Sequence, residues 1–356
     1  MSRADRVSAR LAERGLDALL VTDPVNLRYV TRFTGSNGLA VVGPDVRRFV
    51  TDFRYVEQAK LEVDGFDRER AALQLIEPLA EGWADGDVRL GFDDASLSVR
   101  AHAQLREKLP DRVALVPAAG VVEEERAVKE PEEIERLAAA AAIVDDIYGW
   151  VLERGLVGRT ERDVAVALEH EMRLRGASGS SFPSIVAAAE HGALPHAQPR
   201  DVEIPRDTLV TIDIGARLDG YCSDCTRTYA TGALPGDLAE AYELVLRAQL
   251  ASLAAVAPGP TGREIDAVAR ELITEAGHGD HFGHGLGHGV GLQPHEAPRL
   301  SRAAPDSPLV AGNVVTVEPG VYLPGRGGVR IEDLVVVTEQ GHDVLSRTTK
   351  DLLTVG

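Results

Sequence analysis

The sequence predicts an α/β domain followed by a larger α+β domain that contains an internal duplication. Residues 1–122 alternate short apolar runs with amphipathic segments, which is typical of an α/β arrangement. In residues 123–356 a helix-and-strand pattern occurs twice. A charged segment, 123–131, separates the two patterns, and we therefore place the domain boundary between residues 122 and 123.

The elements of the first domain follow from apolar periodicity and from the residues that end each segment. An amphipathic pattern predicts a helix over 2–14, which Gly15 ends. Similar patterns predict helices over 55–62 and 99–109. Short apolar runs predict five buried strands, over 18–21, 38–42, 48–51, 89–92 and 113–116.

The second domain begins with a helix at Pro131, where the missing N–H of proline needs no partner. Two later helices, over 160–176 and 261–277, each run from a threonine to a glycine and have the same length. Both starts resemble a capping box, and the second fits it fully because Glu264 follows Thr261 by three residues. The matching helices mark the start of two copies.

Each copy continues with an apolar run that ends in an acid and a glycine, and a second acid follows. The two runs are Val210-Thr211-Ile212-Asp213-Ile214-Gly215 and Val315-Thr316-Val317-Glu318-Pro319-Gly320. By position, Asp213 corresponds to Glu318, and Asp224 corresponds to Glu332. We therefore expect two halves that face each other across a pseudo-twofold axis, with the four acids between them.

Four acids in two matching pairs indicate ligands gathered around cations, because a buried carboxylate is costly unless a positive group meets it. For Asp213, which lies among apolar neighbours, a buried ion pair or a strand-end cap is the alternative. Alternation along the strand places Glu332 and Asp333 on opposite faces, and the repeat selects Glu332. Hard oxygen donors with an occasional imidazole suit Mn²⁺, Co²⁺, Fe²⁺ or Zn²⁺.

A histidine-rich segment, 281–289, lies between the acid pairs and can supply an imidazole nitrogen. Its alternate glycines exclude a stable helix and are expected to allow close approach of metal or substrate. An extended backbone puts His284 and His288 on one side. His295 follows shortly afterwards, and His196 lies much earlier. His281 is left open, and the other histidines are assigned to the surface or the core: His102, His170, His191, His278 and His342.

Two cysteines, Cys222 and Cys225, form a C-x-x-C pattern inside the segment 221–229, which reads as one strand. Residues three apart on a strand point to opposite faces. A second C-x-x-C, which a zinc knuckle needs, is lacking in the sequence. We therefore expect neither a disulfide nor a thiolate metal site here.

Composition excludes other classes. The net charge is −18, and the sequence has no cluster of lysine and arginine suited to nucleic acid. It also lacks an apolar run of the ~18 residues that suggests a membrane span. We expect no signal peptide, because the first residues lead directly into a charged amphipathic segment. We expect a cytoplasmic protein that binds neither nucleic acid nor membrane.

Two divalent ions bridged by carboxylates lower the pKa of a shared water, which favours amide hydrolysis.

At this point the motifs resemble those of the pita-bread metallopeptidases, which include aminopeptidase P, prolidase and, more distantly, methionine aminopeptidase. The matching motifs are Phe182-Pro183-Ser184-Ile185-Val186, Leu194-Pro195-His196-Ala197, Asp213-Ile214-Gly215, Ser223-Asp224-Cys225-Thr226-Arg227-Thr228, His284-Gly285-Leu286-Gly287-His288-Gly289-Val290-Gly291-Leu292, Glu318-Pro319-Gly320 and Val329-Arg330-Ile331-Glu332-Asp333. The resemblance implies a creatinase-like N-terminal domain over 1–122 and a pita-bread catalytic domain over 123–356.

The resemblance also implies a site of two divalent ions, with Mn²⁺ expected and Co²⁺ or Zn²⁺ as alternatives. Its metal ligands are Asp213, Asp224, His288, Glu318 and Glu332, with Asp224 and Glu332 as the bridging pair. The residues implied to line the substrate site are His196, His284, His295 and Arg330. Glu318 is expected to shuttle a proton as well as bind metal. We further expect a homodimer.

The expected activity is hydrolysis of the bond between an N-terminal residue and a penultimate proline. Segments 26–30 and 33–38 look more like aminopeptidase P, and prolidase is the alternative. Methionine aminopeptidases generally lack the N-terminal domain and become less favoured. A metal-free creatinase-like hydrolase and a catalytically inactive binding scaffold are the remaining alternatives, and intact ligand positions disfavour both.

Overall fold

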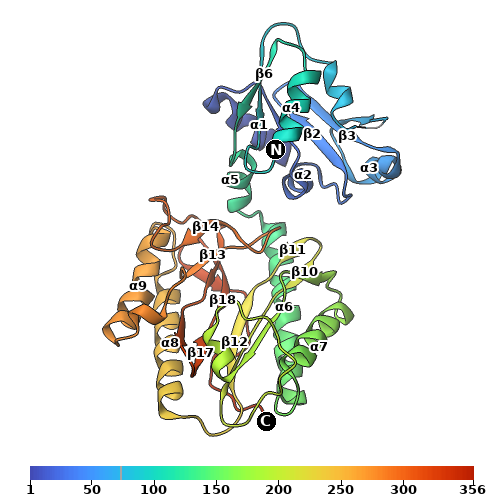
Figure 1. Ribbon diagram of the computed structural model, residues 1–356. Helices are drawn as coiled ribbons and strands as arrows, with labels where there is room; N and C mark the ends of the chain where they lie inside the picture. Colours follow the sequence, from blue (N-terminus) through green and yellow to red (C-terminus); the bar gives the residue numbers. More distant parts are fainter. Residues whose placement is uncertain (73) are drawn as a thin grey trace. The chain divides into compact units, whose positions relative to one another are not determined.

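The computed structural model describes residues 1–72 and 74–356 (Figure 1). The chain folds into two compact units, Met1–Arg126 and Ala127–Gly356. The boundary expected from the sequence, between residues 122 and 123, falls inside helix α5 (Val121–Ala127). Among the described residues, each helix is too short or too polar to cross a membrane.

The N-terminal unit is built around a six-stranded mixed sheet with the order β4-β3-β2-β1-β5-β6. Strand β2 is antiparallel to β1 and β3, whereas β5 is parallel to β1 and β6. The strands are β1 (Ala18–Val21), β2 (Gly38–Val42), β3 (Arg47–Thr51), β4 (Asp67–Arg70), β5 (Val88–Phe92) and β6 (Val113–Pro117). The helices before α5 are α1 (Arg3–Leu11), α2 (Pro24–Thr31), α3 (Val56–Glu62) and α4 (Val99–Lys108).

The five strands predicted for this unit are confirmed to within one residue at each end. Strand β1 is buried at every position, as expected for a continuous apolar run in the middle of a sheet. The predicted first helix is also confirmed: Ser2 caps α1, and a 3₁₀ turn (Ala12–Arg14) extends it to Gly15. The structure adds α2 and β4, which the sequence analysis does not include.

The C-terminal unit consists of two halves, each with a long helix, a shorter capped helix and a set of short strands. The first half contains α6 (Pro131–Arg154), α7 (Glu161–Leu174), β7 (Gly179–Ser180), β8 (Ile185–Ala188), β9 (Leu209–Ile214), β10 (Ala216–Leu218), β11 (Tyr221–Cys222) and β12 (Cys225–Ala230). The second half contains α8 (Gly236–Ala255), α9 (Gly262–Glu275), β13 (Gly287–Gly289), β14 (Glu296–Leu300), β15 (Val314–Val317), β16 (Gly320–Leu323), β17 (Gly327–Arg330), β18 (Asp333–Val337) and β19 (His342–Val344).

The strands of this unit lie between two pairs of helices. Figure 1 shows α6 and α7 on one side and α8 and α9 on the other. The two main sheets have the orders β12-β9-β8 and β14-β13-β15-β18-β19, and every pairing within them is antiparallel. Helices α6 and α7 share a buried apolar core with β8 and β9, and α8 and α9 share another with β15 and β18.

The predicted duplication is visible in the helices that follow each cap. Thr160 caps α7 and Thr261 caps α9, and only α9 has the complete capping box. The buried faces also match, because they lie four, eight and twelve residues after the threonine in both helices. These residues are Val164, Leu168 and Met172 in α7, and Ile265, Ala269 and Ile273 in α9. The same helical phase thus packs each half onto its own sheet.

The segment 221–229 is not the single strand that the sequence predicts. It is interrupted at Ser223 and Asp224, between β11 and β12. The second half has the same interruption at Ile331 and Glu332, between β17 and β18. The break matters because it releases an acid from strand pairing at the same place in both halves.

The glycines of β13 serve strand packing, where the sequence analysis expects approach to metal or substrate. A Cβ atom on Gly287 would lie 2.0 Å from the carbonyl oxygen of Thr316 in β15. A Cβ atom on Gly289 would lie 2.2 Å from the carbonyl oxygen of Ala297 in β14. Glycine is therefore required for the two neighbouring strands to close on β13, and so for the placement of His288 between these glycines.

Candidate metal centre

The four predicted acids lie where strands end or break. Asp213 is the penultimate residue of β9, and Glu318 follows the last residue of β15. Asp224 and Glu332 are the second residues of the two strand breaks. Ligand oxygens of Asp213, Asp224 and Glu332 all lie within 4.8 Å of one another, which is a spacing suited to shared cations.

Glu318 and His288 lie beside this cluster. The His288 Nε2 atom is 3.2 Å from Glu318 Oε1 and 3.7 Å from Asp224 Oδ2. The other ring nitrogen, Nδ1, donates to the carbonyl oxygen of Gly289 over 3.1 Å. The proton on Nδ1 leaves Nε2 as the coordinating atom, which is the usual arrangement in metal-binding histidines. All five predicted ligands are therefore brought together.

Two threonine hydroxyls orient the glutamates. Thr226 of β12 donates to Glu332 Oε2 over 2.7 Å, so a residue of the first half positions an acid of the second. Thr316 of β15 donates to Glu318 Oε1 over 3.0 Å and accepts from the backbone N–H of His288. These contacts hold the carboxylates in fixed directions.

The pKa values of the four carboxyl groups are shifted by burial, by the neighbouring acids and, for Glu318, by His288. Burial, together with the neighbouring acids, raises the pKa of Asp224 and of Glu332 well above the ordinary range. Burial also raises the pKa of Asp213, against the opposing effect of Arg330. For Glu318, burial alone would raise the pKa, but the hydrogen bond and charge of His288 outweigh it and lower the pKa to about 2. Protein groups alone therefore do not stabilise all four ionised acids.

The donor set fits divalent cations. Asp213 Oδ1 and Glu332 Oε1 are buried oxygens without a hydrogen-bond partner among the described residues. A buried carboxylate oxygen of this kind is strongly destabilising unless a positive group meets it. Arg330 compensates only one of the carboxylate charges, through a 2.6 Å contact to Asp213 Oδ2. The oxygen-rich set with one imidazole suits Mn²⁺, Co²⁺, Fe²⁺ or Zn²⁺.

Arg330, expected in the substrate lining, is 4% exposed and is held on all sides by protein groups. Besides Asp213, it donates to the Thr226 hydroxyl, the Pro195 carbonyl oxygen and the Tyr322 hydroxyl. Its guanidinium group thus links β9, β12, β16 and the loop that carries His196. This arrangement gives Arg330 a positioning function for the acids and the tyrosine.

Tyr322 is a component of the site that sequence reasoning missed. Its hydroxyl accepts from Arg330 over 2.9 Å and lies 2.8 Å from Nε2 of His284, whose Nδ1 donates to the Gly285 carbonyl oxygen. The Tyr322 hydroxyl therefore donates a hydrogen bond to Nε2 of His284. A Cβ atom on Gly320 would lie 2.6 Å from the Tyr322 hydroxyl, so the glycine after Glu318-Pro319 leaves space for it. That glycine, two residues before an aromatic residue, was the available signal.

The other two predicted histidines, His196 and His295, lie at the exposed side of the centre. The His295 ring is 4.1 Å from the His288 ring, measured between centroids. Burial and the charge of His288 lower the pKa of His295, and burial lowers the pKa of His284. Both rings are therefore biased toward the neutral form, in which an imidazole can accept a proton.

The sequence matches the metallopeptidase family M24 model over residues 135–339. The chain belongs to metallopeptidase family M24. Residues 3–128 match the creatinase/prolidase N-terminal domain model, so the predicted combination of a creatinase-like domain and a pita-bread domain is confirmed. This chain is therefore an enzyme of a metallopeptidase family.

Solved structures and curated relatives resemble this M24 chain over its full length. The Xaa-Pro dipeptidase from Bacillus anthracis has a TM-score of 0.95 and 39% identity, and 99% of each chain is covered. The X-Pro aminopeptidase from Thermotoga maritima has a TM-score of 0.91 and 34% identity, with 99% and 100% covered. The Xaa-Pro dipeptidase from Pyrococcus furiosus is 35% identical, with 99% of each chain covered.

Residues set aside by the sequence analysis have structural contacts in this M24 protein. Cys222 and Cys225 are buried thiols, and burial raises the pKa of Cys225. Asp333 points away from the acids and forms an ion pair with Arg227 over 2.7 Å. His281, left open by the sequence, lies 3.1 Å from His278 through their Nδ1 atoms. These contacts give none of them a part in the centre.

Proposed function

We propose that this protein is a metal-dependent Xaa-Pro dipeptidase. The observation that carries the proposal is the buried cluster of Asp213, Asp224 and Glu332, which has unpaired oxygens on Asp213 and Glu332 and lies beside His288 and Glu318. This cluster occurs in a chain that matches dipeptidases along its full length. A metal-free hydrolase or an inactive scaffold has no use for such a cluster.

Sequence motifs alone favour aminopeptidase P as the activity. We propose the alternative, prolidase. That preference depends on two short segments, 26–30 and 33–38, which lie in the N-terminal unit. Similarity over the whole chain carries more weight, and most of the similar proteins with an activity in their names are dipeptidases or prolidases. The similarity to an X-Pro aminopeptidase keeps aminopeptidase P as the competing result of the substrate test.

The five clustered residues would hold the metal ions, and Asp224 and Glu332, one from each half, would be among the three acids whose oxygens lie within 4.8 Å of one another. Bound divalent cations would supply a water of lowered pKa and polarise the scissile carbonyl. Mn²⁺ is our proposed metal, with Co²⁺ or Zn²⁺ as alternatives, because oxygen donors dominate the set. The homodimer and the cytoplasmic location expected from the sequence stay predictions.

The chain's own groups then orient the peptide and move protons. Glu318, which the His288 contact keeps ionised, is the carboxylate that we propose to shuttle a proton as well as hold metal. His284 accepts a hydrogen bond from Tyr322, which Arg330 holds in place, so the ring is fixed in one orientation. The exposed rings of His196 and His295 are available for the substrate.

Proline in the second position explains why histidines are needed here. The scissile bond before proline is a tertiary amide, so it has no N–H and its leaving nitrogen belongs to a ring. That nitrogen must gain a proton when the bond breaks. A neutral histidine relays a proton to such an atom more easily than a group that stays charged at pH 7.

The test is a comparison of a Xaa-Pro dipeptide, a Xaa-Pro-Xaa tripeptide and a Xaa-Ala dipeptide with the Mn²⁺-loaded full-length protein. We expect the Xaa-Pro dipeptide to give the highest kcat/KM and Xaa-Ala to be cleaved poorly. Preference for the tripeptide would make the protein an aminopeptidase P. Removal of methionine before alanine, without action before proline, would contradict the proline-specific assignment.

A further inference from the structure

The loops that carry His196 and His284 are each held by a buried acid and an arginine that no step above uses. In the first half the acid is Glu161, at the start of α7. In the second half it is Asp266, in the second turn of α9. Both side chains are 1% exposed, and both accept at least one hydrogen bond from the backbone of a loop that carries a site histidine.

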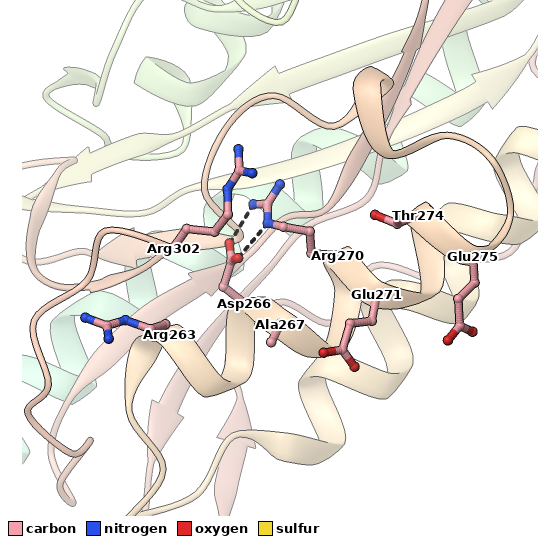
Figure 2. Close-up of a pocket in the computed structure, with 8 residues that line it drawn as sticks. All are labelled: Arg263, Asp266, Ala267, Arg270, Glu271, Thr274, Glu275 and Arg302. Carbon is pink, nitrogen blue, oxygen red and sulfur yellow. Dashed lines mark hydrogen bonds and ion pairs between the residues drawn. The ribbon is translucent and has the colours of Figure 1, made fainter.

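In the second half, Asp266 and Arg270 form a bidentate ion pair across one turn of α9 (Figure 2). Asp266 Oδ1 also accepts from the backbone N–H of Leu286 over 3.0 Å. Arg270 donates to the carbonyl oxygens of Phe282, over 2.9 Å, and of His284, over 2.8 Å. The pair therefore holds the backbone at Phe282, His284 and Leu286 by hydrogen bonds.

Ring packing continues this grip to the imidazole. The Arg270 guanidinium lies 4.2 Å from the centre of the Phe282 ring. The Phe282 ring in turn meets the His284 ring edge to face, with 5.1 Å between centroids and 88° between planes. Arg270, Phe282 and His284 thus form a continuous series of contacts. It ends at the His284 ring, which accepts a hydrogen bond from Tyr322.

In the first half, Glu161 holds both ends of the loop that carries His196. Before that histidine, its carboxylate accepts from the Ala188 backbone N–H over 3.0 Å and contacts Nδ1 of His191 at 2.8 Å. After it, the carboxylate accepts from the backbone N–H of Arg200 over 3.0 Å and from its guanidinium. His196 lies at the middle of this closed loop.

Helix stabilisation alone does not account for the Asp266–Arg270 pair, because an exposed acid–arginine pair one helical turn apart contributes little. The Glu161–Arg200 pair joins α7 to a loop 39 residues away and is not a helix pair at all. Asp266 and Glu161 are instead buried, and each binds loop backbone N–H groups. Burial by itself would raise the pKa of Glu161, but the donors from Arg200 and Ala188 lower it, so this acid stays ionised. A charged group kept in this setting favours a role in holding the loops.

We propose that Asp266 with Arg270, and Glu161 with Arg200, are positioning pairs that set the orientation of His284 and His196 in the site. The inference rests on the proposed function, because it takes His196 as a ring available for the substrate and His284 as the ring that Tyr322 fixes beside it. Among the described residues, neither pair forms a hydrogen bond or ion pair with the side chains of the five proposed metal ligands. Loss of a pair should therefore disturb the histidine and leave the metal in place.

The test compares Arg270→Gln with Arg326→Gln. Arg326 forms a similar bidentate pair with Asp237 in the same half but is exposed and contacts no site loop. In the Mn²⁺-loaded protein we expect Arg270→Gln to lower kcat/KM by roughly 10-fold, as loss of a supporting hydrogen bond does, with bound metal unchanged. Arg270→Lys should recover part of the loss, and Arg326→Gln should behave as wild type.

A second readout is independent of turnover. In metal-free protein with labelled histidine, the ring signal of His284, assigned by its disappearance in His284→Ala, should shift in Arg270→Gln and stay unchanged in Arg326→Gln. An unchanged signal with wild-type kcat/KM would overturn the proposal. So would parallel loss of metal and activity, or the same defect in Arg326→Gln. If Arg270→Gln does not fold, the charge-neutral Asp266→Asn/Arg270→Gln variant replaces it.

The first half gives a separate test in Arg200→Gln, because the Arg200 side chain is 39% exposed and its loss should be tolerated. Its control is Arg162→Gln, which removes the neighbouring exposed pair with Asp201. The ring signal of His196 should shift only in Arg200→Gln. If metal-loaded wild type fails on every Xaa-Pro peptide, the proposed function is wrong, and the ring signals still decide the positioning pairs.

Discussion

The two halves of the C-terminal unit share a scaffold and differ in the groups that they place at the centre. The first half supplies two aspartates, Asp213 and Asp224, and the second supplies two glutamates with His288. Asp213 still belongs to its strand, whereas Glu318 lies one residue past the end of β15. The longer side chain suits the acid that starts beyond its strand.

The difference shows that duplication sets the frame and single residues set the chemistry. In the second half, β13 pairs with β15 and places His288 beside Glu318. In the first half, β8 pairs with β9 in the corresponding place and offers only Ile185, Val186, Ala187 and Ala188. Tyr322 and Arg330 also come from the second half. The groups that we propose to handle protons thus come mainly from one half of a duplicated fold.

The largest effect should come from Glu332, where the two halves of the unit meet. Glu332→Gln removes a charge and an oxygen that we propose as a metal ligand, on a side chain that Thr226 of the first half orients. We expect activity to fall to the level of chelator-stripped protein, with less bound metal. Mn²⁺ or Co²⁺ should restore stripped wild type but not the variant.

The matched control is Glu339→Gln, the same chemical change at an exposed position nearby. It should leave metal content and kcat/KM as in wild type. Full activity in protein shown to contain no metal would contradict the metal centre itself.

A smaller effect should separate His284 of the second half from His196 of the first. Alanine at either position, or at His295, should lower kcat/KM by roughly 10²–10⁴-fold while bound metal stays near its native amount. We expect the larger loss at His284, because it is the ring linked to Tyr322 and Arg330. Kinetics and elemental analysis on the same preparations measure both quantities.

His170→Ala is the control, since His170 is an exposed histidine of α7. Loss of metal in proportion to activity would move the changed histidine into the ligand set. Equal losses at His196 and His284 would show that the two halves contribute equally to proton handling.

The smallest effect concerns the helix caps. Thr160→Ala and Thr261→Ala should each lower the free energy of unfolding by about 1 kcal/mol, because each removes an N-cap acceptor. The loss should be larger at Thr261, where Glu264 completes the capping box and loses its partner as well. Chemical denaturation of metal-free protein measures the difference. A larger loss at Thr160 would contradict the expected contribution of the capping box, because both threonines form a similar backbone bridge, Thr160 to Glu203 and Thr261 to Pro308.

Local patterns predicted much of the fold because they act over a few residues. The strands over 18–21 and 38–42 are apolar at nearly every position, and they have the predicted bounds. Strand β4, Asp67–Arg70, has no apolar residue and forms the edge of its sheet, so periodicity gives no signal for it. Helix α2 carried a usable signal, since Asp23 caps a helix whose first residue is Pro24.

The acids of the site could be selected from the sequence because the repeat marks matching positions, and the histidines could be selected from the histidine-rich segment and the family motifs. Their support could not, because it depends on contacts between distant segments. Tyr322 and His284 are 38 residues apart, and Glu161 and Arg200 are 39 residues apart. The break at Ser223 and Asp224 was missed for a related reason: the neighbouring residues have ordinary strand character, and tertiary packing ends the pairing.

The tight closure of strands around Gly287 and Gly289 has a consequence for sequence divergence. Alanine at either position would collide with a backbone carbonyl, whereas a Cβ atom on nearby Gly283 would meet nothing within 4 Å among the described residues. Mutational tolerance along the histidine-rich segment is thus limited by sheet geometry as well as by chemistry. A descendant that lost His288 and the four clustered acids would still need these two glycines to keep its sheet closed. Its sequence would therefore still resemble that of an active peptidase in this segment.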